Sequence, residues 1–448
     1  MATQDPLQSV SVPKVAFASF IGTLIEFFDM FIFGTASALV FNKLFFPDLD
    51  PFAGTLASFA AFGVAFVVRP LGGAVFGHFG DRLGRKTMLV VSLVLMGGGT
   101  AVVGALPTYA QIGIWAPILL VVTRMLQGLA IGGEWSGAVL MAVEHSPAGK
   151  RAFYGSWPLC GVPAGLVLAT TAFYFVQLLP EQAMLSWGWR IPFLSSAILL
   201  LVGLYIRLRV TESPAFQAVR DKRQESRFPA AEVLRTAKVP TVTAILAMAV
   251  NSVVFYMATV FALSYGAGID GLTRGSMLVA IMIAALFQIA TLPVAAILAD
   301  RYGRRPVLLA GCSMAALAAF PIFWLIDTGN IVAATISMII AVSIVHSTAY
   351  APMASFISEL FETRLRFSGS AIGYQVGSMI WSGPVPFVAA ALFAWSGSSW
   401  PLSVYIVIVS FISFIAIYFA RESYRDDIAS ESDSSEITVQ ESIVAKSR

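Results

Sequence analysis

Charged side chains are scarce in this chain. They make up 12% of its 448 residues, about half the share of roughly 25% that soluble domains carry. Hydrophobic residues make up 58%, and they come in blocks much longer than the core helix of a soluble domain needs. The composition therefore excludes an ordinary soluble protein and favours a chain that crosses a membrane many times.

Cysteine and histidine are also rare. The only cysteines, Cys160 and Cys312, lie within apolar stretches, which excludes a disulfide framework and a cysteine-based metal site. The three histidines, His78, His145 and His346, are too far apart in the sequence to indicate a metal cluster. No H-E-x-x-H, P-loop or G-x-S-x-G pattern occurs. We therefore expect no enzyme activity, no cofactor, no bound metal and no direct use of ATP.

The overall charge limits the kinds of partner that the chain can bind. A net charge of +3 is too small for a nucleic-acid-binding surface. The polar first 14 residues lack the basic and short apolar regions of a secretory leader. We therefore expect membrane lipid, protons and a small molecule as partners, no nucleic acid, and a chain that acts as a monomer.

Twelve apolar runs are each long enough to cross about 30 Å of hydrocarbon as a helix. They cover residues 15–41, 54–79, 87–106, 115–143, 152–179, 189–208, 239–266, 275–298, 306–326, 331–357, 367–394 and 400–420. Lys and Arg gather in alternate loops, whereas the other loops hold little beyond Lys43 and Arg274. Because positive loops stay in the cytoplasm, the pattern predicts a multi-pass protein of the cytoplasmic (inner) membrane with both termini cytoplasmic.

An internal repeat divides the chain. Asp-Arg-x-Gly-Arg begins at Asp81 and again at Asp300, 219 residues later. Both copies follow the second span of a six-span half, as in two similar bundles related by an axis along the membrane normal. We therefore predict an all-α polytopic membrane protein with twelve transmembrane helices in two six-helix bundles. The predicted parts are the N-terminus 1–14, a bundle at 15–209, a cytoplasmic connector at 210–238, a bundle at 239–420 and a disordered tail at 421–448.

The repeated loop has the chemistry of a latch at the membrane surface. An aspartate can accept hydrogen bonds from the free amides at a helix start, and arginines can bridge to acids on neighbouring span ends. Glycine permits a tight reversal or a close helix approach. The alternative is that these charges only fix the topology. The residues given a gating or structural role are Gly77, Asp81, Arg82, Gly84, Arg85, Glu144, Asp300, Arg301, Gly303, Arg304 and Glu359.

Several motifs carry a family resemblance. GHFGDRLGRK resembles the signature loop of the major facilitator superfamily. Further stretches resemble the metabolite:proton symporter family within that superfamily. They are IGTLIEFFDMFIFG, FVVRPLGG, RMLQGLAIGGEWSGA, EHSPAGKRAFYGS, WGWRIPF, RVTESPAF and ELFETRLRFSGSAIGYQVG. The resemblance covers about residues 15–420 and is greatest to the shikimate-carrying members. It implies the major facilitator fold and transport of small carboxylates or zwitterionic osmolytes with protons. Met30, Gln375 and Ala296 depart from the family pattern, which more often has an aromatic residue, Asn and Gly there.

Two carboxylates lie inside the first apolar run. Glu26 and Asp29 are three residues apart, hence on one helical face, and about 18–23 Å along the helix from Lys14. Charges at this depth are costly and functional by default. Two neighbouring carboxylates in a low-dielectric cavity cannot both ionise comfortably, so the pair is the leading candidate for proton coupling. The alternative is that one of them is a structural partner of a neighbouring arginine.

Arginine in the fourth span indicates an anionic substrate. Arg124 lies near the middle of its helix, where a guanidinium can take a carboxylate through two parallel bonds. Arg69 either pairs with Glu134 as a gate or scaffold or contacts the substrate. The other candidates for binding the substrate are neutral polar groups, which alternatively bond only to adjacent helices. They are Gln127 in the first half and Asn251, Tyr256, Gln288, His346, Tyr374 and Gln375 in the second.

Together these features predict a transport function. We expect proton-coupled uptake of a small organic anion, such as a hydroxy or keto carboxylate of the shikimate or 2-oxoglutarate type, by alternating access. Protonation of an acid would free Arg124 for the substrate anion. The alternatives are an osmolyte symporter for proline or betaine, a proton-independent facilitator, and a receptor or scaffold that signals through the acidic tail.

Overall fold

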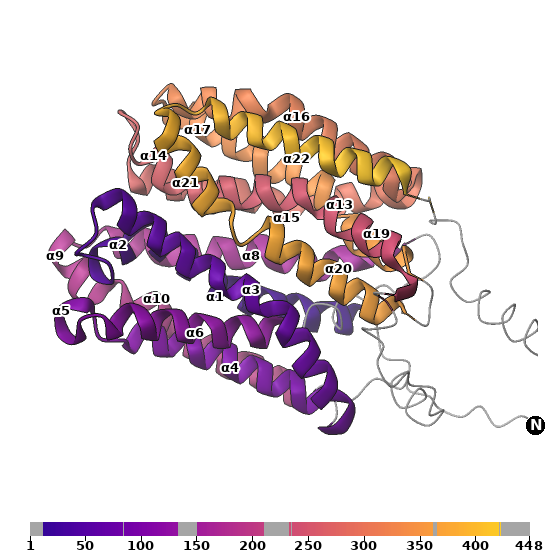
Figure 1. The fold of residues 1–448 in the computed structure, drawn as a ribbon, viewed down its shortest axis with the longest axis horizontal. Helices are drawn as coiled ribbons and strands as arrows, with labels where there is room; N and C mark the ends of the chain where they lie inside the picture. Colours follow the sequence, from indigo (N-terminus) through magenta and orange to yellow (C-terminus); the bar gives the residue numbers. More distant parts are fainter. Residues whose placement is uncertain are drawn as a thin grey trace, which may run out of the picture.

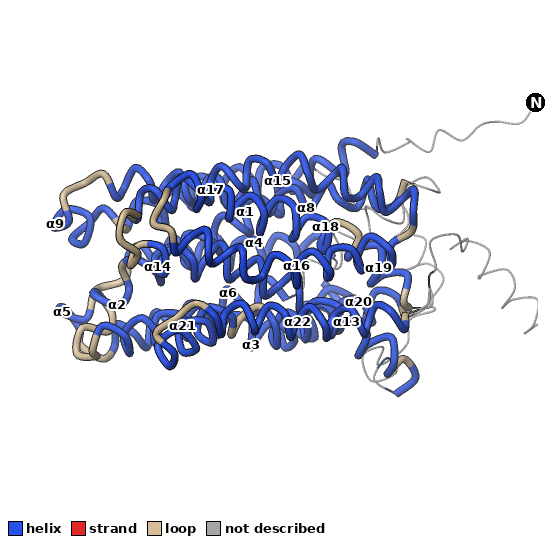
Figure 2. The backbone as a smooth tube through the Cα atoms, turned by 90° about the horizontal axis from the view of Figure 1, so that it is seen from above, coloured by secondary structure: helices blue, strands red, loops and turns tan. Residues whose placement is uncertain are grey.

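The computed structural model describes residues 12–83, 85–132, 150–209, 233, 235–361, 365–420 and 422. Within these ranges, no side chain is described at 12–16, 18, 77–83, 85–87, 89, 206–209 and 367. The described parts are helices joined by short loops, and they contain no strand. Figure 2 shows the long helices running along one common axis, as expected for helices that cross a membrane together.

The first half of the chain supplies six long elements. They are α1 (Val12–Leu39), α3 (Pro51–Leu83), α4 (Arg85–Ala105), α6 (Trp115–Gly132), α8 (Arg151–Gln177) and the π-helix η1 (Met184–Gly188) continued by α10 (Arg190–Arg209). Short helices join them at one end of the molecule, which we call the α5 end (Figure 1). These are α2 (Phe41–Leu44), α5 (Tyr109–Ile112) and α9 (Glu181–Ala183).

The second half repeats this pattern with more interruptions. One span joins α13 (Lys238–Tyr256), the π-helix η2 (Met257–Phe261) and α14 (Ala262–Gly266), and α15 (Arg274–Tyr302) and α16 (Arg304–Asp327) follow. The next span joins α17 (Ile331–Met338), the π-helix η3 (Ile339–His346), α18 (Ser347–Tyr350) and α19 (Met353–Glu359). The last two are α20 (Arg366–Trp381) with α21 (Val385–Ser396), and α22 (Trp400–Phe419). We call the end opposite α5 the α19 end (Figure 1).

The predicted fold class is confirmed. Eleven helices in the described ranges are long and apolar enough to cross a membrane, and the stretch Val90–Ala105 of α4 adds a shorter one. They agree with the twelve apolar runs of the sequence. In Figure 1 the helices of the first half, indigo to magenta, lie beside those of the second half, pink to yellow. The protein is therefore a membrane protein of two six-helix bundles.

Small residues allow α3 and α6 to approach closely. A Cβ atom added to Gly72 of α3 would lie 2.1 Å from the Leu129 carbonyl oxygen, and one added to Gly132 of α6 would lie 2.1 Å from that of Arg69. Gly128 faces Ala65 at a similarly short 2.2 Å. Such close backbone packing is typical of small residues in membrane helices. This packing fixes α3, which carries Arg69, relative to α6, which carries Arg124.

The two halves meet most extensively where α8 packs against α15. Contacts follow this seam, from Thr171, whose hydroxyl donates to the Met282 sulfur at 3.3 Å, to Cys160, whose thiol lies 3.9 Å from the Ile289 carbonyl oxygen. A second contact joins α3 to α20 and α21. There a Cβ on Gly63 would lie 2.8 Å from the Gly383 carbonyl oxygen. The two bundles therefore close around the space between them on two sides.

Aromatic residues divide between the two ends of the molecule. The exposed tryptophans of the described ranges lie at the α5 end, and the exposed tyrosines lie at the α19 end. The tryptophans are Trp115, Trp187, Trp324, Trp395 and Trp400, and the tyrosines are Tyr205, Tyr302 and Tyr418. Both residue types prefer the boundary between hydrocarbon and head groups. The two belts therefore mark where the membrane surfaces meet the protein.

The glycine contact between α3 and α6 predicts a large difference between two alanine substitutions. Gly72→Ala forces the helices apart and should cost about 1–3 kcal/mol of folding free energy. Gly98→Ala is the matched control, because no atom lies within 4 Å of its added Cβ; it should be neutral or stabilise by up to about 1 kcal/mol. Thermal unfolding in detergent, followed by tryptophan fluorescence, measures both. Equal unfolding temperatures would contradict the close packing.

Candidate functional site

Four charged side chains of the first half are buried together between its helices. Glu26 and Asp29 lie on α1, Arg69 on α3 and Arg124 on α6, and each residue is at most 4% exposed. Arg124 lies close enough to interact electrostatically with Asp29 and Arg69, and Asp29 with Glu26. The structure therefore joins the acids and arginines singled out in the sequence into one cluster, which we call the central cluster.

Asp29 is held mainly through one oxygen, and the Thr100 hydroxyl on α4 lies close enough to interact with its carboxylate. Its Oδ1 atom accepts a hydrogen bond of 2.5 Å from the Ser196 hydroxyl on α10. Its Oδ2 atom has no hydrogen-bond partner among the described residues. A carboxylate with one anchored and one unoccupied oxygen is positioned to take a proton or to accept a further donor.

Arg124 is oriented by a chain of polar groups. Its Nη1 group donates to Gln127 Oε1 at 3.2 Å, and Gln127 Nε2 donates to the Thr100 hydroxyl at 2.6 Å. The guanidinium lies 4.4 Å from the centre of the Phe33 ring. Its Nε and Nη2 groups have no hydrogen-bond partner among the described residues. These two groups form one edge of the guanidinium, which is the edge that binds a carboxylate through two parallel bonds.

Arg69 reaches the boundary between the two halves. Its Nη2 group contacts the Met30 sulfur at 3.1 Å, and its guanidinium stacks on Phe66 at 4.0 Å. The Tyr256 hydroxyl of the second half approaches the same sulfur at 3.7 Å. Met30, where the sequence departs from the family pattern, therefore links the central cluster to the second half through a weak acceptor.

The second half lines a small cavity beside this link. Asn251, Tyr256, His346 and Tyr374, four of the neutral polar residues singled out in the sequence, all line it. The cavity also has hydroxyl groups from Ser252, Ser378, Ser382 and Tyr350 and rings from Phe27 and Phe255. Its volume is about 20 Å³, close to the space that one water occupies. In this arrangement the described side chains leave a space that is too small for a metabolite.

Gln288 stands behind the cavity rather than in its wall. Its side-chain amide lies 2.6 Å from His346 Nδ1, and the imidazole is stacked between the rings of Phe255 and Tyr350, at 4.3 and 4.8 Å. This arrangement fixes the plane of the histidine and directs its other nitrogen away from Gln288. Gln288 thus positions His346, and His346 contacts the cavity.

Gln375 bonds across the two halves and does not line the cavity. Its Nε2 group donates to the Gly132 carbonyl oxygen at the end of α6, at 2.9 Å. A direct contact with substrate was predicted from its place in the eleventh span. The structure instead places this amide in the contact between α20 and α6, next to Tyr374, which does line the cavity.

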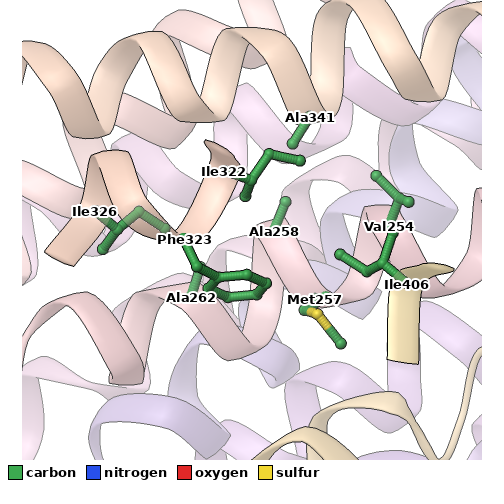
Figure 3. A pocket seen from close by; sticks show the side chains of 9 residues that line it. All are labelled: Val254, Met257, Ala258, Ala262, Ile322, Phe323, Ile326, Ala341 and Ile406. Atoms are coloured by element: carbon green, nitrogen blue, oxygen red, sulfur yellow. The ribbon is translucent and has the colours of Figure 1, made fainter. Parts of the chain in front are cut away.

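A second, purely apolar void lies within the second half (Figure 3). It is enclosed by side chains such as Met257, Phe323 and Ile406 and has a volume of about 10 Å³. None of its nine lining residues carries a polar side chain. Because a substrate with charge or hydroxyl groups needs hydrogen-bond partners, this void is a packing defect beside η2 and not a binding site.

At the α19 end, the second copy of the repeated loop joins the two halves. The Asp300 carboxylate accepts hydrogen bonds from the Ala152 and Phe153 amides at the start of α8, at 3.0 and 2.9 Å. Arg304 lies 3.3 Å from Asp300 and 3.2 Å from Glu359. Gly303, with φ of 104°, makes the reversal between α15 and α16. These charges therefore connect three helices of the second half, α15, α16 and α19, to the start of α8 in the first.

Other predicted charges at this end have different surroundings. Arg301 lies near the ring of Tyr302, 5.4 Å from its centre. The start of α16 is capped by Glu422, which accepts hydrogen bonds from the Arg304 and Arg305 amides at 3.3 and 3.0 Å. The first copy of the loop and two partners lie outside the residues whose side chains the structure describes. These are Gly77, Asp81, Arg82, Gly84, Arg85, Glu134 and Glu144.

Several residues of the site were not singled out in the sequence. Ser196 and Thr100 position Asp29 and Gln127, and Tyr350 packs on His346. Serine and threonine are common in membrane helices, where they usually bond to their own backbone. Nothing in the sequence separates these from Thr170, whose hydroxyl bonds to the Leu166 carbonyl one turn earlier.

The contact made by Asp300 predicts local protection of the start of α8. Asp300→Asn keeps the shape of the side chain but removes the charge and one acceptor. Charge-assisted bonds contribute about 1.5–3 kcal/mol each, so amide hydrogen exchange at 152 and 153 should accelerate at least about tenfold. Asp327→Asn is the control, because Asp327 binds Tyr265 and Ser399 at the α5 end. Unchanged exchange in Asp300→Asn would show that the contact does not hold the two halves together.

Comparison with known proteins gives the family. Residues 19–383 match the Major Facilitator Superfamily. The inner membrane metabolite transport protein YhjE of Escherichia coli K12 is 39% identical, over 93% of this chain and 95% of that protein. The shikimate transporter of the same strain is 38% identical, over 92% and 95%. The solved structure of the xylose transporter XylE from E. coli aligns with a TM-score of 0.71 at 17% identity, covering 94% of this chain and 100% of that one. The chain is therefore a membrane transport protein, not an enzyme, and it belongs to the major facilitator superfamily.

Proposed function

We propose that this protein takes up a small organic anion together with protons by alternating access. The observation that carries the proposal is the unpaired Nε and Nη2 edge of Arg124, which is buried and already oriented by Gln127. A buried guanidinium is costly unless a partner completes its bonds. A substrate carboxylate is the partner that matches this edge in both charge and shape. The names of the two relatives support transport of a metabolite.

Coupling to protons follows from the two acids of the cluster. Ionised Asp29 attracts the Arg124 guanidinium and competes with a substrate anion for it. A proton on Asp29 Oδ2 removes that competition, while the bond from Ser196 to Oδ1 keeps the carboxyl group in place. Glu26, one turn earlier on α1, holds the second exchangeable charge. Proton and anion therefore favour each other's binding, which is the thermodynamic requirement for symport.

The contacts between the halves supply the conformational change. The closed cavity has to open toward one side of the membrane to admit a substrate. Opening at the α19 end breaks the bonds from Asp300 to the start of α8 and the bond from Gln375 to Gly132. These are polar bonds at defined positions, so they re-form when the bundles close. Residues 15–209 and 239–420 would move as the two units.

The distribution of basic residues supports one orientation of the protein in the membrane. Arg301 at the end of α15 and Arg304 and Arg305 at the start of α16 lie at the α19 end, whereas Lys43 in α2 lies at the α5 end. By the positive-inside rule, the α19 end and both termini face the cytoplasm.

Reporter fusions in bacterial cells test this orientation. A fluorescent protein fused after residue 448 should fluoresce, and alkaline phosphatase at the same place should be inactive. Phosphatase inserted after Gly329, in the loop between α16 and α17, should be active because that loop lies at the opposite surface. Active phosphatase after residue 448 would reverse the proposed orientation.

Transport in liposomes tests the proposed coupling. Purified protein is reconstituted with a trapped pH dye, and shikimate, 2-oxoglutarate, citrate and betaine are added separately. Uptake of an acid with protons should acidify the lumen. Asp29→Asn and Glu26→Gln should each strongly reduce that acidification, since each removes one of the two carboxylates that exchange protons.

The control is Ser313→Ala, which removes an exposed hydroxyl bonded only to its own helix; it should transport as the native protein does. Tracer uptake that is indifferent to the pH gradient and to both acid variants would leave a proton-independent facilitator. Uptake of betaine alone would leave an osmolyte carrier.

A further inference from the structure

We infer that the transported anion is a monocarboxylate whose other polar groups are uncharged hydroxyls, and that a second carboxylate excludes a compound from the site. This inference rests on the proposed function, because it concerns the same site. The sequence does not distinguish among hydroxy and keto acids. The inference predicts that the site binds those with one carboxylate and excludes those with two.

The position of charge in the protein favours a monoanion. The first half places Arg69 and Arg124 in the membrane interior. Between the span ends of the second half, the sequence has no Lys, Arg, Asp or Glu at 239–269, 275–299, 306–326, 328–358 or 367–420. Everything that the second half presents to the cavity is therefore formally neutral, apart from any charge that His346 takes up.

His346 is not arranged to supply a positive charge. Its Nδ1 atom faces the Gln288 amide, and its two faces are covered by Phe255 and Tyr350. None of these three neighbours can carry a negative charge that would stabilise an imidazolium in this dry site. His346 is therefore a neutral hydrogen-bonding group, and it offers no ion pair to a second carboxylate.

The number of positions that can bind a carboxylate also favours a monoanion. Arg124 offers one free edge, because its Nη1 group is occupied by Gln127. That edge accommodates one carboxylate. Arg69, the other buried arginine, contacts the Met30 sulfur and stacks on Phe66. A second carboxylate against the wall formed by the second half would have to lie among serine and tyrosine hydroxyls and the Asn251 amide, without a cation from that half. Burying an unpaired charge costs far more than burying a hydroxyl that is hydrogen-bonded.

Asn251 supplies a hydrogen-bond acceptor that has no donor in the described part of the chain. Asn251 is 3% exposed and lines the cavity, yet its Oδ1 atom has no hydrogen-bond partner among the described residues. A carbonyl oxygen of this kind accepts from a hydroxyl and repels a carboxylate. Ser252 and Ser378 beside it can donate or accept as the substrate requires. The cavity therefore selects for hydroxyl groups.

Charge balance agrees with this selection. One proton together with one monocarboxylate adds no net charge to the buried site. A dicarboxylate with one proton adds one negative charge, which burial disfavours.

Matched pairs of acids test the inference in the reconstituted protein. The pairs are 3-hydroxybenzoate with isophthalate and 4-hydroxybutyrate with succinate, and shikimate and betaine are added as further probes. Thermal stabilisation in detergent reports binding without any need for coupling, and tracer uptake reports transport. We expect at least a 100-fold preference for the hydroxy monocarboxylate within a pair. Arg124→Lys should weaken the binding of that monocarboxylate at least tenfold.

A gain of function provides the sharper test. Asn251→Lys places a cation in the neutral wall and should raise binding of the dicarboxylate of a pair at least tenfold. Asn251→Gln is the matched neutral control and should bring no such gain. Ser378→Lys approaches the same wall from α20 and serves if Asn251→Lys does not fold, with thermal unfolding of the unliganded protein as the check.

The outcomes separate this inference from the proposed function. Equal binding of mono- and dicarboxylates by the native protein overturns the inference and leaves anion transport intact. Dicarboxylate binding that is unchanged by both added lysines, in folded protein, also counts against it. Binding of betaine but of no anion, or of no probe at all, overturns the proposed function and the inference together.

Discussion

A guanidinium or carboxylate in hydrocarbon has to find a partner or a proton, and the central cluster meets this requirement only in part. Ser196 bonds to one oxygen of Asp29, and Gln127 bonds to one nitrogen of Arg124. Asp29 Oδ2 and the Nε and Nη2 groups of Arg124 have no hydrogen-bond partner among the described residues. Fully paired charges would be stable but inert. In the proposed mechanism, the incomplete pairing leaves binding energy to be released when a proton and an anion arrive, and the packing of the surrounding helices preserves it.

The helix packing explains how such a cluster stays in place. Glycine contacts bring the backbones of α3 and α6 together, so Arg69 and Arg124 are fixed relative to one another. Rings of Phe33 and Phe66 cover the guanidinium groups and keep lipid away from them. The contacts between the bundles are of another kind, with few polar bonds at the α19 end. In the proposed cycle each half would move as a unit, and the contacts between the halves would break and re-form.

The sequence predicts the architecture better than the site. Length and hydropathy alone indicate the twelve spans, because each has to match the same membrane thickness, and the two Asp-Arg-x-Gly-Arg loops indicate the duplication. Glu26, Asp29 and Arg124 stand out because charge within an apolar run is rare. Gln375 could not be assigned in the same way, since a neutral amide serves substrate and helix contacts equally, and only the structure places it on Gly132. Ser196 could not be predicted either, because many serines and threonines in the spans look alike in the sequence.

The aromatic belts set a length scale for the surroundings of the protein. On α22, Trp400 and Tyr418 are eighteen residues apart, which corresponds to about 27 Å along a helix. This span is slightly shorter than an average hydrocarbon layer of about 30 Å. A thicker bilayer would have to thin around the protein or leave the tryptophan rings below the head groups, each at a small cost per ångström. The stiffness and thickness of the lipid therefore contribute to the energy difference between conformations that expose different lengths of helix.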